Sequence, residues 1–177
     1  MSATEARPSI GPVQVGVIIL ALAAGIIHLY LFLVEGFLGS GAMLPWYQIL
    51  FVGNFFAYVT LAAALYLPIP LLARLRPVVR VLLISIAVAS IVSYFYVDVR
   101  DILGDITQVI ELLLIVLVTI EAGMADPREE LTGKKCDEGG EDVHGVLGAV
   151  IQLVIGIVVG IAMFFIMFSI IRPLTGL

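Results

Sequence analysis

The stretch Asp105-Ile-Thr-Gln-Val-Ile-Glu111-Leu-Leu-Leu-Ile-Val-Leu-Val-Thr-Ile-Glu121 decides the fold of this chain. Together with its apolar flanks it is long enough for a membrane-spanning helix, which needs about 20 mostly apolar residues. Glu111 nevertheless lies well inside its hydrophobic length. An ionisable residue at that depth is costly, so it indicates a functional site and requires a polar partner on another helix.

The composition of the whole chain indicates lipid as its solvent. Of its 177 residues, 62% are hydrophobic and 13% are charged, whereas an ordinary soluble domain has about 25% charged residues. A soluble domain of this length could not bury so much apolar surface. The net charge of −5, with only nine Lys and Arg, argues against nucleic acid as a partner. The one cysteine, Cys136, excludes an internal disulfide and a cysteine-based metal site.

Five segments are long and apolar enough to span a bilayer, and they predict an all-α, multi-pass membrane protein. Prolines support this division, because proline is tolerated in the first turn of a helix and disfavoured further in. Pro45 is expected to begin the second helix, Pro70 to lie beyond its end, and Pro77 to begin the third. The predicted spans are roughly Val13–Val34, Trp46–Leu67, Val78–Val97, Ile102–Ile120 and Val146–Ile171.

The distribution of cations predicts how the chain is oriented in the cell membrane. With five spans, Arg100 and Arg172 fall on one side and the other seven Lys and Arg on the opposite side. Since cytoplasmic segments carry the excess of Lys and Arg, the amino terminus is predicted to be cytoplasmic and the carboxyl terminus outside. The seven cations are Arg7, Arg74, Arg76, Arg80, Arg128, Lys134 and Lys135.

The connections between the spans divide the chain into four parts. Residues 1–12 are predicted to be a cytoplasmic tail, and residues 13–122 a four-helix transmembrane bundle. Residues 123–145 are charged and contain several glycines, which is typical of a mobile cytoplasmic linker. Residues 146–177 contain the fifth helix and a short outer tail, so this helix is predicted to be tethered to the bundle.

Polar residues of different predicted helices fall at one depth in the outer half of the membrane. His28, Asn54 and Glu111 each lie roughly 10–13 Å from the outer end of their helix, at 1.5 Å per residue. Gln108 lies one turn from Glu111, and Tyr94 slightly nearer the outer surface. Because polar groups in lipid face the bundle interior and pair there, we expect a His28–Asn54–Glu111 network that Gln108 and Tyr94 can join.

Three interpretations of this polar layer are open at the level of sequence. The residues can hydrogen-bond across helices to fix the packing, line a pocket for a quinone, haem or chlorophyll, or form a proton or ion path through Glu111. Haem held by two histidines of this chain is disfavoured, because His144 lies at the predicted cytoplasmic rim. His28 and Glu111 alone supply too few ligands for a closed metal site. A path through Glu111 would lack a second buried carboxylate, because Glu121 is expected at the inner rim.

The fifth predicted helix carries a stripe of small and polar residues. Gly148, Gln152, Gly156 and Gly160 follow one another at spacings of four. Gly156-x-x-x-Gly160 is the kind of pattern that lets two membrane helices approach closely. Together with the tether, it predicts that this helix docks either on a neighbouring membrane subunit or back on its own bundle.

The runs His28-Leu-Tyr-Leu-Phe32 and Gln108-Val-Ile-Glu111-Leu-Leu-Leu-Ile-Val-Leu117 resemble segments of uncharacterised small multi-pass archaeal membrane proteins. The resemblance covers the first four helices. What it implies is a four-helix unit with the fifth helix outside it, and it brings no activity with it.

We find no catalytic signature in the chain and do not expect an enzyme. The sequence favours a non-catalytic integral subunit of a larger membrane complex, of the respiratory or photosynthetic energy-converting kind. Such a subunit would contact the lipid bilayer and, through the fifth helix, other membrane subunits. The alternatives are a quinone- or tetrapyrrole-binding redox protein using His28, Asn54 and Glu111, and a small proton or ion transporter working through Glu111.

Overall fold

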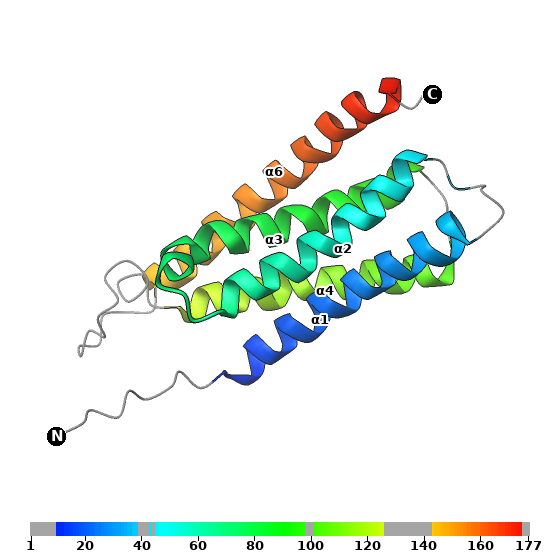
Figure 1. Ribbon diagram of the computed structural model, residues 1–177. Helices are drawn as coiled ribbons and strands as arrows, with labels where there is room; N and C mark the ends of the chain where they lie inside the picture. Colours follow the sequence, from blue (N-terminus) through cyan, green and yellow to red (C-terminus); the bar gives the residue numbers. More distant parts are fainter. Residues whose placement is uncertain (1–9, 39–42, 44, 98–100, 126–142, 175–177) are drawn as a thin grey trace.

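The protein is a bundle of membrane-length helices, seen in a computed structural model (Figure 1). The structure describes residues 10–38, 43, 45–97, 101–125 and 143–174, and these form helices and no strand. Five helices are long and apolar enough to cross a membrane, which confirms the predicted all-α, five-span fold. They are α1 (Pro12–Leu31), continued by the π-helix η1 (Phe32–Phe37), α2 (Pro45–Tyr66), α3 (Pro70–Val97), α4 (Ile102–Met124) and α6 (Val143–Leu174).

Local sequence signals set where α1 and α4 begin. Pro12 occupies the first position of α1, where the missing N–H of proline costs no hydrogen bond. The Asp101 carboxylate accepts a hydrogen bond from the backbone N–H of Gly104 and so caps α4. Asp105 adds a negative charge in the first turn, where it faces the positive end of the helix dipole.

The third helix begins earlier than the sequence predicted. α3 starts at Pro70, so only residues 67–69 separate it from α2. Pro77 therefore lies inside α3 and does not open it. The expectation was wrong because Pro70 itself takes the first-turn position, after which Pro77 removes a single helical hydrogen bond. As a result Arg80, which was assigned to the connection, lies inside the bundle and is buried.

Three other helices also extend past their predicted ends. The first continues beyond Val34 to Phe37, and its last six residues are π-helical. There the Leu38 N–H bonds to the Leu33 carbonyl over 2.8 Å, which is the i to i−5 spacing of a π-helix. α4 ends at Met124 and α6 spans Val143–Leu174, so both helices extend into the segment predicted as the linker. The predicted linker thus lies almost wholly outside the described residues.

The helices pack as a bundle in which α6 joins α1 to α4 (Figure 1). α1 contacts α2 and α4, α3 contacts α2 and α4, and α6 runs along α3 with a second contact to α4. α1 begins and α6 ends at opposite ends of the bundle, as an odd number of spans requires. We call these ends the Pro12 end and the Ile102 end, since α4 begins at the latter. Which end faces the cytoplasm stays a prediction from the cation distribution.

Two glycines of α6 allow its close contact with α3. A Cβ added at Gly156 would lie 2.6 Å from Ile84 Cγ2, and one added at Gly160 would lie 2.6 Å from the Ser85 carbonyl oxygen. A Cβ at Gly148 would meet no atom within 4 Å. Gln152 lies on the same stripe with its Oε1 buried. Of the two docking interpretations of this stripe, the structure has α6 packed on the bundle of its own chain.

Candidate functional site

Glu111 lies fully buried at a point where α1, α2, α3 and α4 come together. Its side chain is 0% exposed and lies about 14 Å along α4 from Ile102. The Tyr58 hydroxyl of α2 donates a hydrogen bond to Glu111 Oε1 over 2.7 Å. His28 Nε2 of α1 lies 3.8 Å from the same oxygen. Glu111 Oε2 has no hydrogen-bond partner among the described residues.

His28 is held in place through both of its ring nitrogens. Nδ1 lies 2.8 Å from the Ala24 carbonyl oxygen one turn earlier in α1, and Nε2 lies 3.2 Å from the Ser90 hydroxyl of α3. A carbonyl oxygen only accepts, so Nδ1 carries the hydrogen. In the neutral ring Nε2 is then an acceptor, and the Ser90 hydroxyl lies where it can donate either to this nitrogen or to Glu111. We call His28, Tyr58, Ser90 and Glu111 the Glu111 cluster.

Small residues let the helices come close enough to form this cluster. Ala24 is fully buried, and a Cβ added at Gly25 would lie 3.5 Å from Tyr58 Cβ and 3.6 Å from the Phe55 carbonyl oxygen. α2 therefore packs closely against α1 one turn before His28. Small residues at such a crossing are the usual way for membrane helices to bring polar side chains into contact.

The Glu111 cluster has a place for one labile proton. If the His28 ring is neutral and Glu111 ionised, the lone pair of Nε2 faces the negative Oε1 across 3.8 Å. That state leaves a carboxylate charge inside the bilayer without a fixed cation beside it, which costs about 3 kcal/mol on insertion scales. One added proton removes this cost, because it either neutralises the carboxyl group or converts the pair into an imidazolium–carboxylate ion pair. The arrangement of these groups can therefore accommodate one proton.

The structure brings together part of the predicted polar layer. His28 and Glu111 lie in one cluster, as expected. Asn54 is half-buried and takes no part in the cluster, because Tyr58, one turn further along α2, occupies the position opposite Glu111. Tyr94 lies nearer the Ile102 end, where its hydroxyl donates to Asp105 Oδ1 over 2.8 Å. Gln108 is half-buried, and its Oε1 is buried without a hydrogen-bond partner in the described part of the chain.

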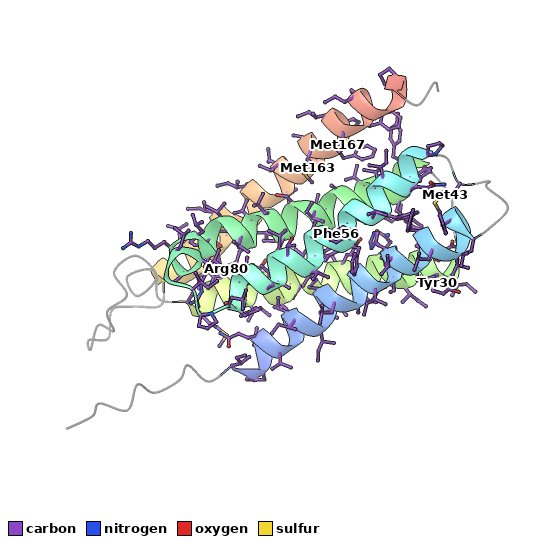
Figure 2. The ribbon with its side chains drawn as sticks, in the orientation of Figure 1. Tyr30, Met43, Phe56, Arg80, Met163 and Met167 are labelled. Carbon is purple, nitrogen blue, oxygen red and sulfur yellow. The ribbon has the colours of Figure 1, made fainter. Side chains whose placement is uncertain are left out.

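A second ionisable pair lies nearer the Pro12 end of the bundle. Arg80 of α3 donates from Nε to Glu121 Oε2 over 2.7 Å and from Nη2 to Glu121 Oε1 over 3.1 Å. Both residues are buried, at 2% and 8% exposure, and Figure 2 shows Arg80 near this end of the bundle. Glu121 thus faces the inside of the bundle, about one turn before α4 ends at Met124. A guanidinium stays charged under all ordinary conditions, and this bidentate contact joins α3 to α4 as an ion pair.

An apolar layer separates the Glu111 cluster from the Arg80–Glu121 pair, which lie about 15 Å apart along α4. Every helix from α1 to α4 contributes to it. The buried hydroxyl at this level, Ser85, bonds to the Val81 carbonyl of its own helix, so it offers nothing to either site. The layer consists of Val17, Ala62, Leu83, Leu114 and Val118, all at most 5% exposed.

Sequence reasoning missed three of these residues. In the sequence, Tyr58 is one of several aromatic residues of the second span. The one signal that could have singled it out is that it lies four residues after Asn54, and therefore on the same face of the helix. Arg80 was placed with the arginines before it, although it is followed by an apolar run that continues the helix. Ser90 was overlooked because serines are common in membrane helices and bond readily to their own backbone.

The donor set of the Glu111 cluster fits protons better than metals or haem. The described residues contain no group of three or more His, Cys, Asp or Glu side chains that could hold a metal ion. Both ring nitrogens of His28 are engaged, so an axial bond to a tetrapyrrole metal would have to break the contact with Ser90. Comparisons with known protein families, with curated proteins and with solved structures found no match to this chain.

Proposed function

We propose that this protein is a proton-handling integral membrane protein in which Glu111 takes up and releases one proton within the bilayer. Tyr58 and His28 are the partners that hold the carboxyl group and share its proton. The proposal favours the transporter alternative among the interpretations of the sequence. It also fits a proton-binding component of a larger energy-converting membrane complex.

The observation that carries the proposal is the 3.8 Å separation between His28 Nε2 and Glu111 Oε1. A purely structural polar contact in a membrane is expected to be fully hydrogen-bonded, because unsatisfied groups are costly there. Here two groups with variable protonation face each other, and Glu111 Oε2 has no partner in the described part of the chain. Such a site changes its proton number at lower cost than a saturated network does.

The contrast with the Arg80–Glu121 pair supports this assignment. Both sites contain a buried glutamate of α4 and a side chain with nitrogen donors from another helix. At Glu121 this side chain is an arginine with a permanent charge and two short hydrogen bonds, and such a pair has no labile proton. At Glu111 it is a histidine, whose charge changes near neutral pH in ordinary surroundings. Of these two sites, the Glu111 site is the one that combines burial with two partners that can exchange a proton.

The other interpretations have less support of their own. A subunit that docks through the glycines of α6 would need those glycines at its free surface, and Gly156 and Gly160 face α3 of the same chain. A redox cofactor at His28 would compete with Ser90 and the Ala24 carbonyl for the ring nitrogens. Membership of a membrane complex and cofactor binding therefore stand as weaker proposals.

Infrared spectroscopy of the protein in lipid tests the proposal. A protonated carboxyl group has a carbonyl stretch distinct from that of a carboxylate, and it shifts on exchange into D2O. We expect a band from a buried carboxylic acid that responds reversibly to bulk pH and is absent in Glu111→Gln. The matched control is Glu121→Gln, which should retain the band. If the band persists unchanged in Glu111→Gln, Glu111 is not the proton site and the proposal is wrong.

A further inference from the structure

The two directions along the bundle from Glu111 differ in chemistry. Towards the Pro12 end, the apolar layer follows directly, with Leu114 and Val118 of α4 at 1% and 0% exposure. Beyond it lies the Arg80–Glu121 ion pair. A proton moving this way would have to cross apolar side chains, which raises its electrostatic free energy.

Towards the Ile102 end, polar groups continue from Glu111 along α4. Gln108 lies one turn away on the adjoining part of the same helix face. A further turn on, Asp105 accepts the hydrogen bond from Tyr94 and is exposed at the end of the helix. Thr107 is buried, and its hydroxyl bonds to the Leu103 carbonyl, so the polar route runs through Gln108.

Two oxygens without partners mark the first step of this route. Gln108 Oε1 and Glu111 Oε2 are both buried, and neither has a hydrogen-bond partner among the described residues. Both are acceptors unless the carboxyl group is protonated there. Two acceptors one helical turn apart are suited to a shared donor, and water is the donor that fits a buried polar position and carries protons.

We infer that Glu111 exchanges its proton with one membrane face only, through Gln108 and the Asp105–Tyr94 pair at the Ile102 end. The inference rests on the proposed proton site at Glu111 and adds the side from which it is reached. The apolar layer closes the other direction. Gln108 is a positioning residue in this scheme, because it orders the water that meets Glu111 Oε2 and does not itself give up a proton.

Cysteine accessibility tests the access route without reference to proton binding. In a Cys136→Ser background, a membrane-impermeant maleimide is added to either face of oriented membrane vesicles containing the full chain. Ile102→Cys and Met124→Cys report the two faces, since both positions are exposed, at 81% and 72%. We expect Gln108→Cys to react only from the face that labels Ile102→Cys, and Val118→Cys to react from neither. Reaction of Val118→Cys from the Met124 face, or an inert Gln108→Cys, would overturn the inference.

Deuterium exchange supplies a second readout in case a cysteine variant folds poorly. The Gln108→Leu variant should slow the D2O shift of the Glu111 carboxyl band several-fold. The matched control is Thr119→Val, which removes a hydroxyl from the opposite side of Glu111 and should leave the exchange rate unchanged. Equal exchange rates in the two variants would argue against the route. A lost band would instead refute the proton site itself, so the two proposals fail in distinguishable ways.

Discussion

The Tyr58 hydroxyl lies 2.7 Å from Glu111 Oε1 and joins α2 to α4 inside the bundle. Replacing Tyr58 by Phe removes this hydrogen bond and keeps the ring. Interhelical hydrogen bonds in membranes contribute about 1–2 kcal/mol in model systems, so the free energy of unfolding should fall by this amount in mixed micelles titrated with denaturing detergent. Tyr66→Phe is the matched control, since its buried hydroxyl has no hydrogen-bond partner among the described residues. Equal losses in the two variants would contradict the prediction.

Because Arg80 and Glu121 form a buried pair, we predict that substitutions of the two residues have strongly non-additive effects on the free energy of unfolding. Arg80→Met leaves the Glu121 carboxylate buried without its cation, and breaking a buried ion pair in this way costs about 3–5 kcal/mol. Glu121→Leu should cost a similar amount. The double variant should recover most of the loss, because no charge is then left buried. Thermal unfolding in detergent, read as a double-mutant cycle, measures the coupling. Additive losses would show that the two side chains act independently.

Glycines of α6 should differ sharply in their tolerance of a methyl group. Gly160→Ala places a Cβ 2.6 Å from the Ser85 carbonyl oxygen, and backbone cannot yield as a side chain does. Overpacking of this kind costs about 1–3 kcal/mol. At Gly148 no neighbour stands within 4 Å of the new Cβ, so Gly148→Ala should stabilise the helix by about 0.5–1 kcal/mol. Unfolding of both variants checks the difference, and a neutral Gly160→Ala would mean that α6 does not dock through this glycine.

The cation distribution predicts that the amino terminus is cytoplasmic. Moving Arg80 into the bundle reduces the imbalance and does not reverse it, because six Lys and Arg are still counted against Arg100 and Arg172. A fluorescent protein fused to the amino terminus should mature in the cytoplasm, whereas a periplasmic or extracellular reporter should be active only at the carboxyl terminus. The opposite reporter pattern would reverse the assignment of the two faces. It would leave the internal geometry of the bundle unaffected.

Hydropathy was sufficient to predict the five helices, because a helix that spans a bilayer requires a long apolar run. It was less informative about where the helices begin and end, because a proline can either lie in the first turn of a helix or follow its last residue. Pro70 and Pro77 are both compatible with a first turn, and the sequence does not show which of them begins the helix.

Depth counting was sufficient to place His28 with Glu111, and it failed for Asn54 by one turn. An error of that size is inherent in counting from uncertain helix ends, since one turn is about 5.4 Å. The partner of Glu121 escaped prediction for a different reason. Charged residues of membrane proteins are normally found outside the lipid. A buried Arg–Glu pair is an exception, and the sequence alone does not show that an arginine and a glutamate of different helices will meet.

The two polar sites also determine which helices are able to move. α3 and α4 are joined by the Arg80–Glu121 pair near the Pro12 end, and α2 is joined to α4 by Tyr58, so sliding any of these helices past another would break a buried contact. α1 is held to α3 through the contact between His28 Nε2 and the Ser90 hydroxyl, and it packs on α2 at Gly25. The imidazole of His28 therefore links α1 both to α3 and to the Glu111 site. A displacement of α1 would change the contacts of this ring with Ser90 and Glu111 together, and with them how tightly the site holds its proton.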